Sequence, residues 1–315
     1  MNALYVVSSG MLTLIQDLGR QKVGHLGLSA GGPADVHAFC WANRLVGNRS
    51  DRPALEITFG KVILRAQCDV MLALTGAEMS ASIDGIAIGN WRSFLLKQGQ
   101  ELKLGYAKKG FRAYLAIQNG INVPKSYGSA ATVVRNQLGG LAQSPGRALQ
   151  EGDSFGNGNS VNEILEPKFV PPRFIPQYHQ DVKIGVFETY QANLFPKKQK
   201  NKFYSNAYAV SDKLDRMGIR LQGEAIFAER EGQPVKGILS EGIAHGSIQF
   251  PPNGQPIILI NDRQTLGGYP KLGCVSKMSL MRLAQARPGV NLHFYPADMA
   301  QETENYVKFL KFFDI

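Results

Sequence analysis

The sequence contains few cysteines, few charged residues and no long apolar run. Its 315 residues include three cysteines, Cys40, Cys68 and Cys274, which lie far apart without CxxC spacing. Such usage is typical of a reducing compartment and argues against a structural zinc site. No apolar run approaches the roughly 20 residues of a membrane helix, and no basic amino-terminal segment precedes an apolar core and a cleavage site. We therefore expect a soluble, cytoplasmic protein that does not bind membranes.

Several catalytic signatures are also missing. The chain has no G-x-x-x-x-G-K-[ST] segment, so a P-loop ATP site is excluded. The histidines lack the spacing of metal ligands, and we predict no metal site. Residue types of a hydrolytic triad are present, at Ser240, His245, Ser247 and Asp262. Nothing around them resembles a nucleophile elbow, which argues against serine-hydrolase chemistry.

The charge is strongly basic. Thirty-five Lys and Arg against 25 Asp and Glu give a net charge of +10 and a pI near 9.5. A nucleic-acid partner, an anionic small-molecule substrate and a generally basic proteome would each explain this balance. The basic residues are scattered, and we interpret their one dense cluster, Lys197–Lys202, as a solvated loop. Nucleic acid is therefore the least favoured partner.

The composition favours a mainly β fold. Hydrophobic residues make up 44% of the chain, charged residues only 19%, and 34 glycines and 16 prolines follow no period. Short runs rich in β-branched and aromatic residues alternate with Gly or Asp turns, a spacing that indicates a closed barrel or a sandwich. Asp84-Gly85 predicts a two-residue hairpin turn. The main strands are expected at Leu4–Val7, Met11–Ile15, Ala54–Phe59, Lys61–Arg65, Val70–Thr75, Phe111–Ile117, Asp181–Phe187, Gly218–Leu221, Gly246–Phe250, Ile257–Ile260 and Val290–Tyr295.

Helical spacing of apolar residues appears in three places, Pro33–Val46, Ser276–Ala286 and Ala297–Phe312. A polar and then proline-rich stretch, Gly156–Pro172, is typical of a linker. The sequence therefore predicts two domains, residues 1–160 and 173–315.

The segment Asn253–Pro270 is the leading candidate site. It runs from a Gly-containing turn through an apolar strand into the polar run Asn261, Asp262, Gln264 and Thr265 and then Gly267-Gly268. Polar side chains on a loop held by a rigid strand are typical of binding sites. Asp262 would orient or deprotonate a substrate, Gln264 and Thr265 would hold a carboxylate or amide, and the glycine amides would form an anion nest. Alternatively, Asp262 pairs with Arg263 or caps a turn, and the glycines only serve positive φ.

Two further groups are weaker candidates. Arg216 or Arg220 would clamp a carboxylate or phosphate in the same cleft, unless both lie on the solvated face of a strand. In the first half, a possible second pocket is formed by Gln16, Asp17, Arg20 and Asp35. A buried hydrogen-bonded network that supports the neighbouring Gly-rich stretch is the favoured alternative for these four.

A series of segments, in this order, resembles the biotin-dependent carboxyltransferase-like family over nearly the whole chain. This family was long labelled allophanate hydrolase subunit 2 and includes the C subunit of 5-oxoprolinase. The segments are Gln16–Arg20, Gly27–Asp35, Ala42–Asn48, Ala54–Gly60, Leu74–Ala77, Arg112–Ala116, Gly139-Gly140, Asp215–Gly218 and Asn253–Pro270. The Ser-Ser-Lys signature of amidase-type allophanate hydrolases is absent, so we do not expect allophanate hydrolysis.

The resemblance implies two cyclophilin-like β-barrel domains with a few helices. It also implies a complex with 5-oxoprolinase subunits A and B, the latter having a related fold, that opens 5-oxoproline to glutamate with ATP bound by the partners. Under this hypothesis the catalytic residues are Asp262 and Thr265. The substrate-binding residues are Arg216, Asn253, Gln255, Gln264, Gly267, Gly268 and Tyr269.

The same resemblance leaves two alternatives open. Related domains of urea carboxylase move a carboxyl group from carboxybiotin, which would make biotin the cofactor. Regulatory members of the family imply instead a non-enzymatic interaction protein that acts through the B subunit.

Overall fold

The computed structural model describes residues 2–157, 166–178 and 181–315, and it divides into two compact units. Unit 1 comprises Met1–Gln21, Gly31–Tyr178 and Phe313–Ile315, and unit 2 comprises Lys22–Ala30 and His179–Phe312. Part of the predicted linker, residues 158–165, lies outside the described residues. The domain limits expected at residues 160 and 173 stay predictions.

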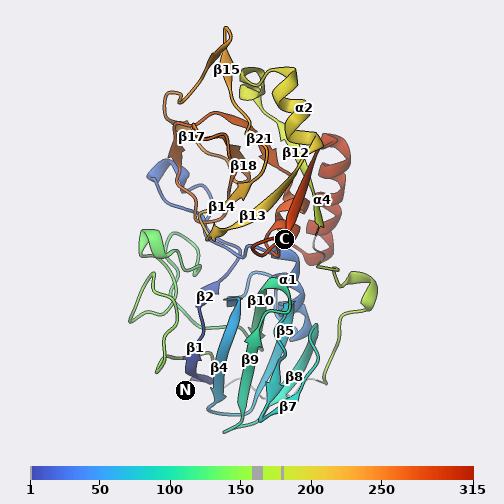
Figure 1. Ribbon diagram of the computed structural model, residues 1–315. Helices are drawn as coiled ribbons and strands as arrows, with labels where there is room; N and C mark the ends of the chain where they lie inside the picture. Colours follow the sequence, from blue (N-terminus) through green and yellow to red (C-terminus); the bar gives the residue numbers. More distant parts are fainter. Residues whose placement is uncertain (1, 158–165, 179–180) are drawn as a thin grey trace. The chain divides into compact units, whose positions relative to one another are not determined.

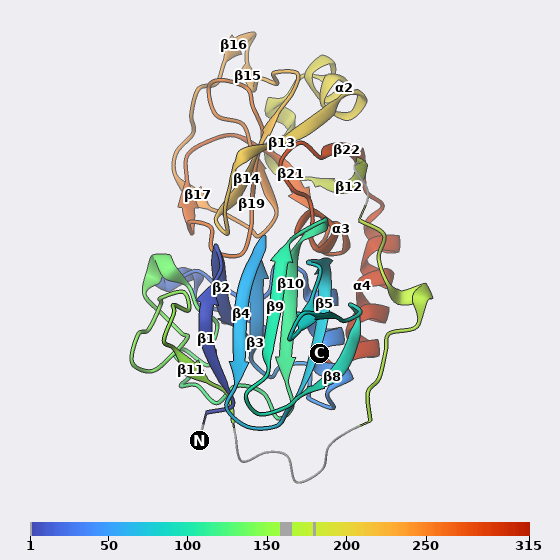
Figure 2. The same cartoon turned by 60° about the horizontal axis from the view of Figure 1, so that its bottom comes forward.

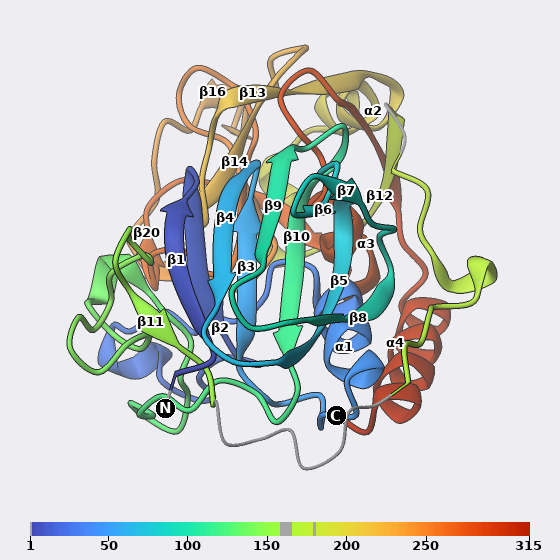
Figure 3. The same ribbon diagram turned by 90° about the horizontal axis from the view of Figure 1, so that it is seen from below.

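Unit 1 is built from two antiparallel sheets. The six-stranded sheet has the order β11 (Ser154–Phe155), β1 (Leu4–Ser9), β4 (Gly60–Ala66), β9 (Glu101–Tyr106), β6 (Ser82–Ile83), β7 (Ile86–Ala87). Figure 2 and Figure 3 show β1, β4 and β9 side by side in this sheet. The five-stranded sheet has the order β2 (Leu12–Gln16), β3 (Ala54–Thr58), β10 (Lys109–Ile117), β5 (Val70–Glu78), β8 (Arg92–Leu96). Of the two arrangements expected from the strand spacing, unit 1 therefore shows two sheets around one core.

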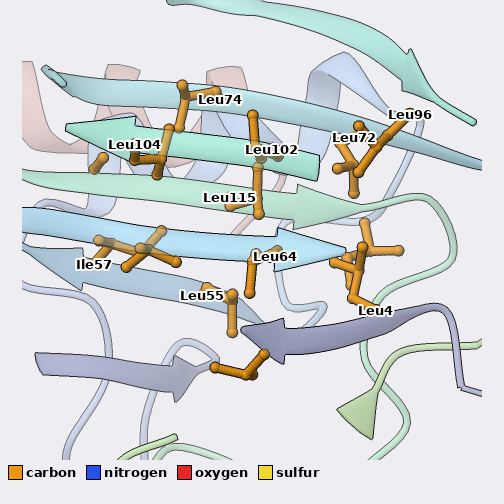
Figure 4. Packing of buried hydrophobic residues seen from close by; sticks show 14 of the residues in the cluster. Leu4, Leu55, Ile57, Leu64, Leu72, Leu74, Leu96, Leu102, Leu104 and Leu115 are labelled. Atoms are coloured by element: carbon orange, nitrogen blue, oxygen red, sulfur yellow. The ribbon is translucent and has the colours of Figure 1, made fainter. Parts of the chain in front are cut away.

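The core of unit 1 follows from the strand patterns. Residues of β4 alternate between buried and more exposed, as a strand with one face on the core requires. Every residue of β5 except Glu78 is buried, because its second face is covered by α1 (Val36–Leu45). Leucine and isoleucine side chains from both sheets, including Leu64 and Leu115, pack together in the cluster drawn in Figure 4.

Helix α1 and the hairpin β6–β7 confirm two sequence predictions. The Asp35 side chain caps α1 by accepting a hydrogen bond from the Ala38 amide at 3.1 Å. In the hairpin, Asp84 and Gly85 have φ of 48° and 85°, the left-handed values that a two-residue type I′ turn needs.

Unit 2 contains a closed seven-stranded barrel. Its strands follow one another as β12 (Asp181–Glu188), β21 (Lys271–Val275), β18 (Ser247–Gln249), β19 (Ile257–Leu259), β14 (Gly218–Gln222), β13 (Ala207–Leu214) and β22 (Asn291–Pro296). A parallel pairing of β12 with β22 closes the barrel. Several of these strands are labelled in Figure 1. Two short ribbons, β15 (Glu229–Arg230) with β16 (Gln233–Pro234) and β17 (Glu241–Gly242) with β20 (Leu266–Gly267), complete the strands.

The barrel interior is aliphatic and aromatic. Ile184, Ile219, Ile248, Leu272 and Leu292 are fully buried in one cluster. They come from five different strands, so the barrel closes around a single core. The expected mainly β class and the expected barrel in the second half are confirmed.

The helices of unit 2 are α2 (Lys197–Ser205), α3 (Lys277–Leu283) and α4 (Met299–Phe313), whose last residue is counted with unit 1. Helices α3 and α4 confirm predictions, and the Ser276 side chain caps α3. The prediction of a loop at Lys197–Lys202 is wrong, because this segment is helical. Phe203, which follows the lysine cluster in the same helix, is fully buried. Its ring stacks on that of Phe294 with centroids 4.5 Å apart, and this contact holds the helix on the barrel.

Short 3-10 helices occur at Gly24–Leu26, Val134–Asn136, Pro172–Phe174 and Tyr190–Leu194. In the part of the chain that the structure describes, no helix has the length and apolar character needed to cross a bilayer.

Candidate functional site

The polar part of the predicted segment Asn253–Pro270 begins where β19 ends, and it runs beside the turn that precedes β14. The Ile260 amide donates to the Met217 carbonyl at 3.0 Å, and the Asp262 amide donates to the Arg216 carbonyl at 2.7 Å. The Arg263 amide then donates back to the Ile260 carbonyl, which forms a turn. Backbone bonds thus hold the polar residues at one end of the barrel.

Asp262 and Arg216 form a buried, two-pronged ion pair. Arg216 Nε and Nη2 each donate to an Asp262 carboxylate oxygen at 2.9 Å. This fork is the geometry in which arginine binds a carboxylate most strongly. The sequence alternative that paired Asp262 with Arg263 is wrong. The carboxylate that was expected to act on a substrate is occupied by an arginine 46 residues away in the chain.

The loop is also held from a distant part of the chain. Ser29, in the Lys22–Ala30 segment of unit 2, donates through its hydroxyl to the Asp262 and Arg263 carbonyls at 3.2 and 2.9 Å. Arg263 in turn donates from Nε to the Ile243 carbonyl at 3.1 Å. These contacts give the loop a defined backbone before any ligand binds.

A cavity of about 460 Å³ opens beside the loop in unit 2. Its walls carry side-chain amides, two cationic residues, acidic residues and apolar surface, a mixture typical of a small-molecule site. The lining residues are Asp212, Lys213, Leu214, Asp215, Met217, Gly218, Arg220, Gln249, Pro251, Ile257, Leu259, Gln264 and Tyr269. Of the predicted binding residues, Gln264 and Tyr269 are brought together here.

Gln249 is the most informative residue of this cavity. Its side chain lies on β18 and is only 2% exposed, and its Nε2 has no hydrogen-bond partner among the described residues. Leaving a buried amide donor unpaired costs about 1–3 kcal/mol. An acceptor atom of a bound molecule would recover that free energy, so the cavity has a donor ready for a ligand.

Gly267 is required beside this donor for steric reasons. A Cβ at Gly267 would lie 2.9 Å from Gln249 Nε2 and 2.6 Å from Ile243 Cδ1. Neither Gly267 nor Gly268 has φ in the left-handed region. The alternative that these glycines serve positive φ is therefore wrong, and the pair lacks the alternating backbone of an anion nest. Their role in substrate binding stays a prediction.

Thr265, Asn253 and Gln255 make contacts within the fold. The Thr265 carbonyl accepts from the Ile243 amide at 2.9 Å beside the β17–β20 ribbon. Asn253 Oδ1 accepts from the Gln255 amide, and the Gln255 side chain exchanges two hydrogen bonds with the Gly223 backbone. Asn253 and Gln255 line a separate cavity of about 450 Å³, which shares Lys213 and Arg220 with the first.

The side chains of the four candidate residues in unit 1 form hydrogen bonds with other groups of unit 1. Gln16 joins the Thr132 carbonyl to the Gly32 amide with bonds of 2.9 Å. Asp17 accepts from Ser129 Oγ and from the Ala130 amide, at 2.5 and 2.6 Å.

Arg20 donates to the Ser126 and Ala131 carbonyls, and Asp35 caps α1. All four residues are buried, and none lines either cavity described above. This is the arrangement that the structural-network interpretation predicts, including support for Gly32 in the Gly-rich stretch.

A second polar network lies beside the β17–β20 ribbon. Glu241 forms an ion pair with Lys271 and accepts hydrogen bonds from Tyr190 and from Gln191, the latter at 2.5 Å. The bond from Lys271, followed by that from Tyr190, lowers the pKa of Glu241. Glu241 thus remains charged and pairs with the buried Lys271.

A third cluster combines Ser247 on β18 and Cys274 on β21 with His245, which precedes β18, and Lys277, the first residue of α3. Lys277 Nζ lies 3.1 Å from His245 Nδ1, and Cys274 Sγ lies 3.5 Å from Ser247 Oγ. Burial, followed by the positive charges of Lys277, Arg263 and Arg216, lowers the pKa of His245 well below its ordinary value. Within the described ranges, this cluster included, no three His, Cys, Asp or Glu side chains group closely enough to hold a metal ion.

Comparison with known proteins gives the family. The model of the family described as "Carboxyltransferase domain, subdomain A and B" matches residues 26–296 of this chain. The chain belongs to this family. The resemblance found in the sequence is therefore confirmed.

The relatives of this carboxyltransferase-family chain differ in length. The C subunit of 5-oxoprolinase from Escherichia coli (strain K12) is 34% identical over 307 residues, which cover 95% of this chain and 92% of the relative. The crystal structure of Kluyveromyces lactis urea carboxylase is 28% identical with a TM-score of 0.88, and the match covers 99% of this chain but 29% of that one. Another solved structure, 32% identical with a TM-score of 0.82, is matched over 94% of this chain and 56% of its own length.

Several site residues were not predicted from the sequence. Gln249 lies in an apolar strand, and Glu241, Lys271 and Cys274 lie outside any recognised motif. The only available signal was the strand pairing, because Gln249 and Cys274 lie on the neighbouring strands β18 and β21. Only knowledge of the strand order would have brought them together.

Proposed function

We propose that this chain is the C subunit of an ATP-dependent 5-oxoprolinase, which opens 5-oxoproline to glutamate. The observation that carries the proposal is the match to the Escherichia coli C subunit over 95% of this chain and 92% of that relative. The two chains therefore correspond over nearly their whole lengths. The urea carboxylase chain, in contrast, is matched over 29% of its length.

In this function the cavity beside Gln249 receives 5-oxoproline. The molecule carries a lactam carbonyl and a carboxylate, and both are hydrogen-bond acceptors. Gln249 Nε2 supplies a buried donor without a partner in the described structure, and Gln264 supplies a second amide. Lys213 and Arg220 line the same cavity together with Asp212 and Asp215, so the lining includes cations that can pair with the carboxylate of the ligand.

Asp262 and Arg216 act in this proposal as positioning residues. Their forked ion pair holds the loop that carries Gln264 and Thr265, and both carboxylate oxygens of Asp262 are engaged by Arg216. Thr265 remains the predicted catalytic residue, and Gly267 and Gly268 remain predicted substrate-binding residues. Tyr269, half-exposed at the cavity, would cover the bound ring.

ATP supplies the activation that a ring amide needs. Transfer of the γ-phosphoryl group from ATP to the lactam oxygen releases ADP and makes the carbonyl carbon electrophilic. One water attacks that carbon, the ring C–N bond breaks as the ring nitrogen takes a proton, and an acyl phosphate remains. A second water hydrolyses the acyl phosphate to glutamate and phosphate. We place the nucleotide with partner subunits A and B, since this sequence has no G-x-x-x-x-G-K-[ST] loop. The residues of this chain bind and orient the lactam.

The test is reconstitution. The chain is mixed with candidate subunits A and B, 5-oxoproline and ATP, and the release of glutamate and ADP is measured for every combination. Glutamate should form only when this chain is present. A complete lack of glutamate in all combinations would refute the proposal.

A second candidate is carboxyl transfer from a biotin carrier, favoured by the family description and by the likeness to urea carboxylase. The ureido carbonyl of biotin would take the place of the lactam carbonyl against Gln249. This alternative predicts binding of free biotin and of a biotinylated partner protein, and the absence of both would contradict it.

A further inference from the structure

Arg263 and Lys277 are positive groups of unit 2 that lack an acidic partner. Arg216 is paired with Asp262 and Lys271 with Glu241. Within the described residues, however, no carboxylate lies in ion-pair contact with Arg263 or Lys277. Arg263 is partly buried, where a cation without a counter-charge is costly, and the exposed Lys277 adds a second positive charge that repels it.

The backbone fixes the Arg263 guanidinium in place. Nε donates to the Ile243 carbonyl at 3.1 Å and Nη1 to the Ile260 carbonyl at 3.5 Å. Among the described contacts Nη2 makes none, so part of the donor fork remains available. An arginine held by carbonyls on one side offers its other side to an external acceptor.

His245 and Cys274 lie beside the two cations. Lys277 has only donors, so His245 Nδ1 must accept its hydrogen bond at 3.1 Å, and the imidazole is therefore neutral. Cys274 stands opposite Ser247 on the paired strands β21 and β18, three residues before Lys277. None of these residues lines the cavity at Gln249.

The electrostatics agree with this geometry. Burial lowers the pKa of Arg263, and burial followed by the charge of Arg263 lowers the pKa of Lys277. An ionised Cys274 thiol acts in the opposite direction on both cations. A negative group at this place would relieve the repulsion between the two cations.

We propose that Arg263, Lys277 and neutral His245 form an oxyanion-binding pocket, with the Cys274 thiol at its edge. The ligand is a carboxylate or phosphoryl group, because a guanidinium fork and an ammonium group bind both. The pocket is separate from the Gln249 cavity and does not depend on the proposed function, since anion binding is measurable on the chain alone.

Cys274 provides the test, because it reports on charge at the pocket. The full-length chain is treated with iodoacetate, which is anionic, or with iodoacetamide, which is neutral. In both reactions the sulfur–carbon bond forms as the carbon–iodine bond breaks and iodide leaves. Peptide mass spectrometry gives the rate at Cys274 and, as an internal control, at Cys68 in unit 1, which is also partly exposed.

We expect the ratio of iodoacetate to iodoacetamide rates at Cys274 to fall about tenfold in Arg263→Gln/Lys277→Met, because the attraction for the anionic reagent is lost. Lys198→Met, which removes an exposed charge on α2, should leave the ratio unchanged. Inorganic phosphate, acetate and 5-oxoproline are then added to the wild-type chain as competitors.

Slower iodoacetate labelling of Cys274, with Cys68 unaffected, supports the pocket. Stronger protection by inorganic phosphate would identify the ligand as a phosphoryl group, and stronger protection by acetate or 5-oxoproline would identify it as a carboxylate. Lack of protection by all three, together with an unchanged ratio in the double variant, would overturn the proposal. If the double variant does not fold, the protection of Cys274 by the competitors in the wild-type chain decides the test alone. A chain that is protected at Cys274 but shows no 5-oxoprolinase activity would support the anion site and contradict the proposed function.

Discussion

Two buried polar regions of the molecule use their hydrogen-bonding groups differently. In unit 1, Gln16, Asp17 and Arg20 bind backbone groups around residues 126–132. In unit 2, the equally buried Gln249 has an amide nitrogen without a partner among the described residues, and it faces a cavity. Buried polar residues that look alike in a sequence thus either support the fold or remain available to a ligand, and their partners show which.

The largest expected effect concerns the ion pair of unit 2. Asp262→Asn removes the carboxylate charge that the buried Arg216 binds through two hydrogen bonds, which should reduce the free energy of unfolding by about 3–5 kcal/mol. Urea unfolding of the full chain measures the loss. The double variant Arg216→Met/Asp262→Leu removes both charges and should be more stable than the single variant. Equal stability of the two variants would show that the pair does not hold the loop.

The next effect tests the unpaired amide. Gln249→Leu keeps the approximate volume but removes the donor, so it should lower kcat/KM of the reconstituted 5-oxoprolinase about 100-fold, or about 2.7 kcal/mol. Its own stability should not fall, because no hydrogen bond within the described structure is lost. Gln301→Leu, which removes an exposed side-chain amide of α4 that among the described residues bonds only Asn305 in the same helix, serves as the control for activity. Unaltered kinetics in Gln249→Leu would place the substrate elsewhere.

The corresponding change in unit 1 should affect stability alone. Asp17→Asn weakens charge-assisted bonds from Ser129 and Ala130 and should destabilise the chain by about 2–3 kcal/mol. Under conditions in which the variant is folded, kcat/KM should equal that of the wild type. A loss of activity in the folded variant would instead support the predicted second pocket in unit 1, and the two buried regions would then no longer differ in role.

The smallest effect is a pH dependence in unit 1. Burial lowers the pKa of His37 to about 4, and its Nε2 accepts from Trp41 Nε1 at 3.1 Å. The unfolded chain therefore binds this proton first, and stability is lost as pH falls from about 6.5 to about 4. His37→Gln should remove about 1–2 kcal/mol of the loss at pH 5. Urea midpoints at pH 5 and pH 7.5 measure it; the same pH dependence in both proteins would contradict the assignment.

Local patterns predicted much of the fold. Asp84-Gly85 formed the expected hairpin, and apolar spacing located α1, α3 and α4. The helix at Lys197–Ser205 was missed because its stability comes from Phe203 packing on Phe294, about ninety residues later. A local charge pattern contains no information on such a contact.

The candidate site was predicted in part. The loop after β19 was placed correctly as a polar segment at the end of a strand, and Gln264 and Tyr269 line the cavity. Asp262 was correctly singled out, but its carboxylate is bound by Arg216. Gln249 had no local signal, because one glutamine in a short apolar strand is indistinguishable from a solvent-facing residue until the strand pairing is known.

The sequence alone determined the mainly β class, the helices α1, α3 and α4, and the family, since these depend on residue type, local periodicity and ordered motifs. Tertiary structure alone decided which polar groups are paired. Arg216 reaches Asp262 across 46 positions, whereas Gln249 Nε2 and the Arg263–Lys277 pair have no such partner among the described residues. The physical reason is that hydrogen bonds and ion pairs act over a few ångströms, and only folding brings distant residues within that range.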